Sequence, residues 1–150
     1  MKVALAADHG GFRLKETIKD FLGERGVAFH DFGCYSEKSC DYIDWGEKAA
    51  EKVAKGEFER GILICGTGLG MNIVANKFPG VRAAACYDLY ATRQSREHND
   101  CNILVLAGRM TGEDLAREIV NEWLTAKFKK DERYKRRLEK LKKLEQKNFK

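Results

Sequence analysis

Cys65 and the glycines that follow it form the segment with the clearest capacity for chemistry. Cys65 ends an apolar run and precedes residues 66–70, which read Gly-Thr-Gly-Leu-Gly. Backbone N–H groups in such a loop can approach an anion closely and stabilise a phosphate or an oxyanion. The same surroundings favour the thiolate of a cysteine, so Cys65 is a candidate base or nucleophile. The alternative is a glycine-rich turn beside a buried cysteine that has no chemical role.

The spacing of these glycines is not that of a nucleotide-binding loop. The dinucleotide pattern G-x-G-x-x-G requires a third glycine where Met71 stands. The P-loop pattern requires a lysine after its last glycine, and none follows here. Both kinds of nucleotide site are therefore excluded for this segment.

Two histidine-containing pairs are further candidates. Asp8 and His9 follow the first apolar run, where a carboxylate beside an imidazole can bind sugar hydroxyls or phosphate. A structural histidine and a carboxylate that caps a helix would look the same in sequence. His98 and Asn99 precede the last apolar run, and His98 is a candidate acid–base group. Its alternative is a polar helix end.

The elements that must position these residues alternate along the chain. Short apolar runs separated by segments of helical periodicity are typical of βαβ units around a parallel sheet. Ligands of such sheets bind beyond the carboxyl ends of the strands. The sequence predicts strands at 3–7, 27–32, 60–65, 81–86 and 103–106, each buried on both faces, and helices at 12–22, 42–55, 70–77, 89–98, 112–125 and 132–147.

Composition indicates a folded protein with one core. The 150 residues are 43% hydrophobic and 34% charged, and we expect a single domain over residues 1–150. The first residues lead straight into a predicted strand, and no apolar run is long enough to span a bilayer, so we expect a cytoplasmic protein that is not bound to a membrane. The five cysteines include no C-x-x-C pair. We therefore expect neither a disulfide framework nor a zinc site, with Cys86 and Cys101 in the core and Cys34 and Cys40 in a loop.

Positive charge is concentrated at the C-terminus. Residues 126–150 carry twelve Lys or Arg and four Asp or Glu, whereas the preceding residues are slightly acidic. Because aromatic residues are not interleaved with this charge, it favours a solvated basic helix. Binding of nucleic acid is the alternative, and a steep loss of affinity with salt would identify it.

Together, these segments resemble the ribose-5-phosphate isomerase B family, which also includes galactose-6-phosphate isomerase subunits and allose-6-phosphate isomerases. The resemblance covers essentially the whole chain. It is carried by Asp8-His-Gly-Gly-Phe12, Asp41-Tyr42, Gly61-Ile-Leu-Ile-Cys-Gly-Thr-Gly68, Ala75-Asn-Lys-Phe78, Gly80-Val-Arg-Ala83, Ser95-Arg-Glu-His-Asn-Asp100 and an arginine-bearing C-terminal helix.

The resemblance implies a Rossmann-like three-layer αβα sandwich with a five-stranded parallel sheet and a C-terminal helix. It also implies a homodimer, or a tetramer, with a shared active site that needs no metal and no organic cofactor. Cys65, with Thr67 beside it, would move a proton between C1 and C2 of the sugar, and His98 would open the ring. The substrate would be bound by Asp8, His9, Tyr42, Gly66, Gly68, Leu69, Gly70, Asn99, Arg109, Arg133 and Arg137.

The sequence departs from the family pattern in two segments, the second of which bears on the substrate. Ile43 replaces the proline that usually follows Asp-Tyr. The family's Gly-Gly-Arg-His segment is replaced by residues 129–134, which read Lys-Lys-Asp-Glu-Arg-Tyr. An alignment with one inserted residue makes Arg133 and Arg137 the phosphate arginines, four apart on one helix face. The alignment without the inserted residue makes Arg136 the second phosphate-binding arginine. We favour Arg133 and Arg137, because guanidinium groups bind phosphate in a bidentate manner.

The expected reaction is the interconversion of ribose 5-phosphate and ribulose 5-phosphate through a cis-enediolate, in the pentose phosphate pathway. The nearest alternative is the same chemistry on allose or galactose 6-phosphate, or on a free rare sugar. A non-catalytic sensor of phosphosugars or nucleotides is a different class of hypothesis. Cys65 and His98 argue against a sensor, because binding alone requires neither a thiol nor an acid–base histidine.

Overall fold

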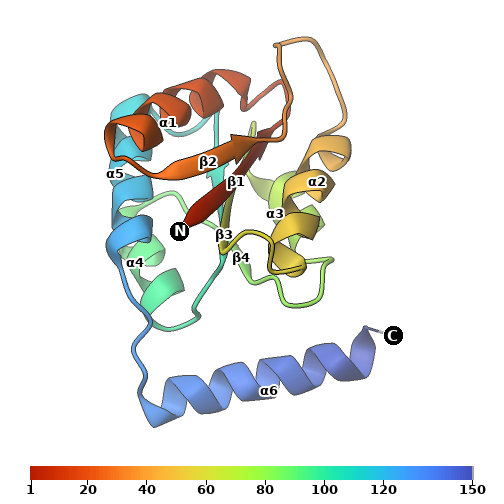
Figure 1. Ribbon diagram of the computed structural model, residues 1–150, viewed down its shortest axis with the longest axis vertical. Helices are drawn as coiled ribbons and strands as arrows, with labels where there is room; N and C mark the ends of the chain where they lie inside the picture. Colours follow the sequence, from red (N-terminus) through yellow and green to blue (C-terminus); the bar gives the residue numbers. More distant parts are fainter. Residues whose placement is uncertain (150) are drawn as a thin grey trace.

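The molecule is built around an all-parallel sheet. Within residues 1–149, the part of the chain that the computed structural model describes, the sheet has five strands in the order β2-β1-β3-β5-β4 (Figure 1). The strands are β1 (Lys2–Ala7), β2 (Ala28–Asp31), β3 (Arg60–Cys65), β4 (Ala83–Ala85) and β5 (Ile103–Ala107).

Helices cover both faces of this sheet. One face is covered by α1 (Phe12–Glu24) and α5 (Glu113–Thr125), with α4 (Leu89–Glu97) against α5. The other face is covered by α2 (Tyr42–Ala54) and α3 (Leu69–Ala75). The expected three-layer αβα sandwich is therefore confirmed, and the helices and strands end within two residues of the predicted positions.

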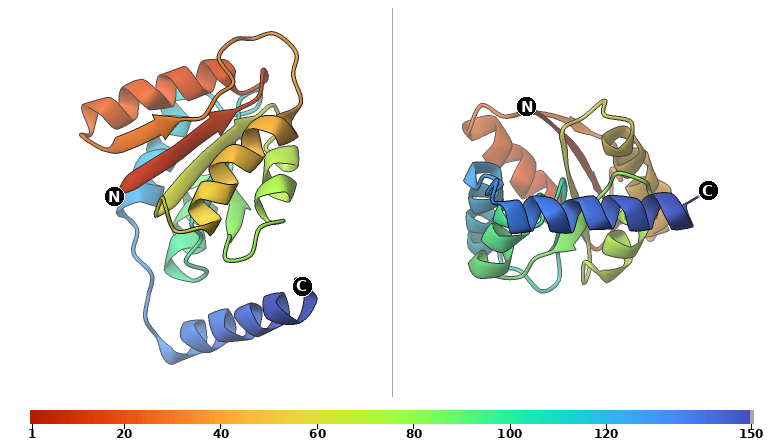
Figure 2. Two further views of the ribbon diagram at one scale, coloured as in Figure 1. Left: turned by 45° about the vertical axis from the view of Figure 1, so that its right-hand side comes forward. Right: turned by 90° about the horizontal axis from the view of Figure 1, so that it is seen from below.

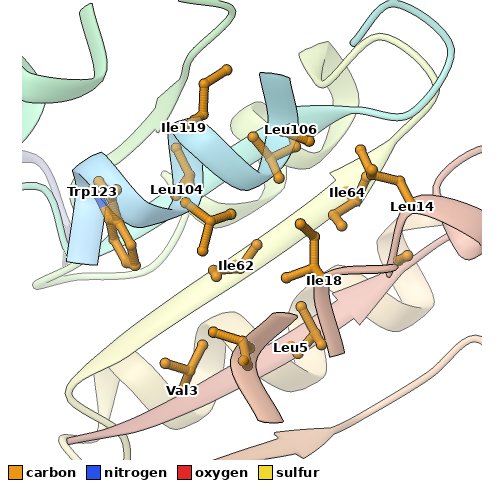
Figure 3. Packing of buried hydrophobic residues seen from close by; sticks show 14 of the residues in the cluster. Val3, Leu5, Leu14, Ile18, Ile62, Ile64, Leu104, Leu106, Ile119 and Trp123 are labelled. Carbon is orange, nitrogen blue, oxygen red and sulfur yellow. The ribbon is translucent and has the colours of Figure 1, made fainter. Parts of the chain in front are cut away.

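The alternation of side chains along the central strands produces two separate cores. On β1, Val3 and Leu5 face α1 and α5, whereas Ala4 and Ala6 face α2 and α3. Figure 3 shows the first core, in which Ile62 lies between Leu5 and Leu104. Larger side chains fill the α1–α5 side and alanines line much of the other, so the α2 and α3 helices approach the sheet closely.

The prediction that each strand is buried on both faces is confirmed for β1, β3 and β5, and it is wrong for the edge strands β2 and β4. Residues of β2 alternate between exposed and half-buried, and those of β4 are all half-buried. Each edge strand has a strand neighbour on one side only, and no helix covers β2 on the α2 side as it covers β1. Sequence alone ranks strands by hydrophobicity and does not give their order in the sheet.

The strand order reverses between β1 and β3, and loops from three strands meet there. Asp8 N–H donates to the Ile64 carbonyl at 3.1 Å, and Gly108 N–H donates to the Cys65 carbonyl at 2.8 Å. The backbones are so close that a Cβ on Gly108 would lie 2.4 Å from the Gly10 carbonyl oxygen. The reversal point of an open α/β sheet is where such folds bind ligands.

The C-terminal helix α6 (Glu132–Asn148) lies apart from the sandwich. Figures 1 and 2 show it beyond the amino ends of the strands, joined to α5 by an extended segment. Tyr134 is its single buried residue among those described, and Leu141 and Leu144 are exposed. A cavity of about 690 Å³ separates these leucines from β4, far from the reversal point. The prediction of a basic, largely solvated helix is confirmed. No helix within residues 1–149 is long and apolar enough to cross a membrane.

A buried ion pair ties the edge strand β2 to α1. The Lys15 side chain is fully buried, and its Nζ donates to Asp31 Oδ1 at 2.8 Å and to the Cys34 carbonyl. Burial alone would raise the pKa of Asp31, but hydrogen bonds from Lys15, the Gly33 N–H and Lys19 outweigh it and lower that pKa. The carboxylate is thus stabilised in its charged form.

We predict that Asp31→Asn lowers the free energy of unfolding by about 3–5 kcal/mol, because it leaves the Lys15 ammonium buried without its counter-charge. Urea denaturation measures this. Glu51→Gln, which breaks the solvent-exposed pair with Lys55, is the matched control and should change stability little. A loss no larger than the control's would contradict the prediction.

The pH dependence of this difference has a defined sign. Because the folded-state pKa of Asp31 lies below its unfolded value of about 3.9, its contribution is fully present above that value. It is lost as the pH falls through the folded pKa. The stability difference between wild type and Asp31→Asn should therefore be constant near neutral pH and shrink in acid.

Candidate active site

Cys65 lies at the carboxyl end of β3. Its side chain is 4% exposed and belongs to the core on the α2–α3 side of the sheet. Its carbonyl accepts the Gly108 N–H, which fixes the strand end against the loop after β5. The strand end that carries the thiol is therefore anchored to the loop after β5.

The loop after Cys65 presents unpaired N–H groups, as the sequence indicates. Gly68 adopts a φ of +81°, a conformation that favours glycine, and the Tyr87 hydroxyl donates to the Thr67 carbonyl at 2.8 Å. Leu69 N–H donates to Thr67 Oγ1 at 3.3 Å and is thus engaged. Within residues 1–149, no acceptor lies opposite the backbone N–H groups of Gly66, Thr67, Gly68 and Gly70.

Asp8 and His9 lie beside this loop, each with a defined orientation. Asp8 is 7% exposed, and its Oδ1 accepts the Gly11 N–H at 3.1 Å, which closes a turn ahead of α1. His9 Nδ1 accepts the Cys40 N–H at 3.2 Å. A backbone N–H can only donate, so the neutral His9 ring carries its proton on Nε2. His9 can therefore donate that Nε2–H to a ligand.

His9 and Arg109 line one small cavity. The Arg109 side chain packs on Gly66, where an added Cβ would lie 3.3 Å from Arg109 Nη1. On the other side of the loop the Tyr42 ring packs against Gly70. The cavity measures about 260 Å³ and carries donors suited to an anion. It is lined by His9, Gly10, Arg13, Leu14, Glu37, Gly108 and Arg109.

The structure does not bring His98 and Asn99 to Cys65 within one chain. His98 follows the last turn of α4, and the Asn99 carbonyl accepts Arg82 Nε–H at 2.9 Å just before β4. Both thus lie at the amino edge of the sheet, whereas Cys65 pairs with Ala107 at the carboxyl edge. At about 3.3 Å per residue, β5 alone separates the two edges by roughly 15 Å.

The start of α6 packs against His98. The Tyr134 ring is stacked on the imidazole with centroids 4.3 Å apart, and its hydroxyl lies 2.9 Å from His98 Nε2. Because the two rings are nearly parallel, the Tyr134 hydroxyl approaches His98 Nε2 from above the imidazole plane. We therefore regard ring stacking as the main interaction between the two side chains. Arg133 donates to the Tyr134 hydroxyl at 2.8 Å, and the Arg137 guanidinium lies 6.0 Å from the ring centroid.

Tyr134 is the residue that sequence reasoning did not place in the site. Its position in the sequence could have indicated this role, since Tyr134 stands between Arg133 and Arg137 in the segment that departs from the family pattern. Its contact with His98 joins residues 36 positions apart, which sequence periodicity cannot show.

The remaining cysteines behave as expected from their positions. Cys86 and Cys101 are buried in the body of the protein, and burial raises the pKa of the Cys86 thiol and raises that of Cys101 to about 12. Cys34 and Cys40 lie in the loop between β2 and α2. Within residues 1–149, no three His, Cys, Asp or Glu side chains are grouped so as to hold a metal ion.

Comparison with known proteins identifies the family of the chain. The family model described as Ribose/Galactose Isomerase matches residues 3–141. Ribose-5-phosphate isomerase B of Escherichia coli is 44% identical over 145 residues, which cover 97% of each chain. The 4-deoxy-4-sulfo-D-erythrose isomerase of a Clostridium species is also 44% identical, over 85% of this chain and 81% of its own.

A solved structure extends the likeness to the backbone. Ribose-5-phosphate isomerase B of Clostridium thermocellum is 52% identical and superposes with a TM-score of 0.95, over 98% of this chain and 99% of its own. With a family model and relatives that cover nearly the whole sequence, the chain belongs to the ribose/galactose isomerase family and is a sugar-phosphate isomerase of the ribose-5-phosphate isomerase B type.

Proposed function

We propose that this enzyme interconverts ribose 5-phosphate and ribulose 5-phosphate through a cis-enediolate, without a metal or an organic cofactor. The observation that carries the proposal is the buried Cys65 thiol at the foot of a loop with four unpaired N–H groups. A base beside preorganised donors is what proton transfer next to a carbonyl requires. In a cell this reaction belongs to the pentose phosphate pathway of the cytoplasm.

The proposed steps assign the ring-opening proton to one residue and the carbon-bound proton to another. His98 opens the sugar ring by moving a proton between the ring oxygen and the C1 hydroxyl. The Cys65 thiolate then takes the proton from C2 of the open aldose, and the loop amides stabilise the negative charge on the enediolate oxygens. The Cys65 thiol returns the proton to C1 while the hydroxyl proton on O2 passes to O1 across the cis-enediolate, which gives the ketose. The loss of one such donor can cost about 3–4 kcal/mol of barrier.

A second copy of the chain would complete the site. Because one chain holds His98 and Cys65 at opposite edges of the sheet, we assign His98 to the partner subunit of a homodimer, or of a tetramer built from such dimers. The same partner subunit would also supply Asn99, Arg133 and Arg137. These residues lie next to His98 or on the helix that covers it. Tyr134 would keep the His98 ring in one orientation by stacking on it.

The phosphate would lie between the two copies. His9 Nε2–H and Arg109 donate from one subunit, and Arg133 and Arg137 donate from the other, while Asp8 and Asn99 bind hydroxyls. The distance from these donors to Cys65 would set the length of sugar accepted. A relative that acts on a sulfonated four-carbon sugar shows that the family accepts other chain lengths and another anion. Allose or galactose 6-phosphate, or a free rare sugar, remains the second candidate substrate.

We predict that Cys65→Ala lowers kcat about 10²- to 10⁴-fold, the usual contribution of a positioned base. Cys65→Ser should recover little, because a hydroxyl ionises far less readily than a thiol. Calorimetry should show near-normal binding of substrate by Cys65→Ala, because the phosphate donors are intact. Cys86→Ala, at another buried cysteine, should keep its turnover. Normal kcat in Cys65→Ala would place the base elsewhere and favour a sensor.

The arginine assignment is tested with neighbouring residues of α6. Arg133→Ala and Arg137→Ala should each raise KM for ribose 5-phosphate about 10- to 100-fold, because each removes a charge-assisted hydrogen bond. The matched control is Arg136→Ala, an equally basic position that makes no contact with Tyr134. KM for free ribose should change little in all three variants. A larger effect of Arg136→Ala would support the alignment without an insertion.

A further inference from the structure

Two cysteines that the proposed reaction does not use lie in the loop that is hydrogen-bonded to residues 7–9. Cys40 donates its N–H to His9 Nδ1, and its Sγ lies 3.7 Å from the same nitrogen. Cys34 N–H donates to the Ala7 carbonyl at 2.7 Å, so Cys34 flanks the same short segment two residues earlier. The chain bends back between the two cysteines at residues 36–38. The backbones of both cysteines are therefore hydrogen-bonded to residues 7–9, and the Cys40 thiol contacts His9.

The two thiols differ in accessibility. The Cys34 side chain is 3% exposed, and its Sγ donates to the Ser36 carbonyl at 3.3 Å. Burial raises the pKa of the Cys34 thiol, and the neighbouring Cys40 raises it further. Cys40 is half-buried and touches an imidazole, so it is the thiol that a reagent meets first.

We propose that Cys40 is a covalent modification site for low-molecular-weight disulfides, and that Cys34 resolves the adduct into an intramolecular disulfide that loosens His9. Part of this inference, the effect on activity, rests on the proposed function, in which His9 donates to the phosphate. The chemistry of the two thiols does not depend on it.

The proposed oxidation consists of two thiol–disulfide exchange steps, in which atoms and electrons balance. The Cys40 thiol loses its proton to solvent, and the thiolate attacks one sulfur of glutathione disulfide, forming a mixed disulfide and releasing one glutathione thiolate. The Cys34 thiol then loses its proton to solvent, and its thiolate attacks the Cys40 sulfur and releases the second glutathione thiolate. Each released thiolate takes up one proton from solvent. The two protein thiols are oxidised to one disulfide, and glutathione disulfide is reduced to two thiols. A dithiol reagent reverses both steps.

Closure of the disulfide would alter the hydrogen bonding of His9. The Cys40 sulfur would turn from His9 toward Cys34, and the Cys40 N–H that fixes Nδ1 as the acceptor would be displaced. The imidazole would then lose the contact that directs its Nε2–H into the small cavity. Because the hydrogen bond from the neutral imidazole to the phosphate is weakened, we expect KM for ribose 5-phosphate to rise about 2- to 10-fold.

The test uses the full-length reduced enzyme and glutathione disulfide. Peptide mapping after oxidation should show Cys34 joined to Cys40 and Cys65 still a free thiol, with a mass lower by two hydrogen atoms. KM should rise, and dithiothreitol should restore it. Cys34→Ser should stop at the mixed disulfide, with one glutathione on Cys40. Cys40→Ser should gain no disulfide and keep its KM. Cys101→Ser is the matched control and should respond as wild type.

Three outcomes would overturn the inference: no Cys34–Cys40 disulfide in the mapped wild type, a disulfide without any change in KM, or equal inhibition of Cys40→Ser by the oxidant. Failure of the proposed function is a separate result, because the reduced wild-type enzyme would then be inactive on ribose 5-phosphate. Peptide mapping of the disulfide would still be decisive in that case, since it requires no substrate.

Discussion

The parallel register of β1, β3 and β5 is the constraint on which the rest of the site depends. Hydrogen bonding in that register places the ends of three strands at one edge, where close backbone contacts between glycines hold Asp8, Cys65 and the Arg109 loop together. Side chains on both faces are fully buried, so these strand ends cannot shift without opening two cores. The packed sheet thus holds the proposed base, Cys65, in a fixed position relative to the loop amides that we propose as its hydrogen-bond donors.

The same register explains why half of the proposed site lies elsewhere. A residue that precedes a parallel strand lies at the amino edge, so His98, just before β5, is about one strand length from Cys65. At that edge it is stacked under Tyr134 of a basic helix that leaves the body of the protein. Catalysis and assembly are therefore linked in our account, because a lone subunit has the base without the ring-opening group.

The sequence was sufficient for local features and insufficient for long-range pairs. Hydrophobic periodicity predicted each strand and helix, and the glycine spacing after Cys65 predicted the loop of unpaired amides. The edge positions of β2 and β4 depend on strand order, which periodicity does not contain. Lys15 could not be assigned to the interior, because its burial requires Asp31 from another element. The contacts of Tyr134 with His98 and of Cys40 with His9 were missed for the same reason.

Complementation between inactive variants tests the shared site most directly. Cys65→Ala and His98→Asn each remove one half of it, so each homodimer should be nearly inactive. After subunit exchange, half of the dimers would be mixed, and each mixed dimer would hold one intact site, so the mixture should recover about a quarter of wild-type activity. A mixture that exchanges subunits and stays as inactive as its components would contradict a site built from two copies of the chain.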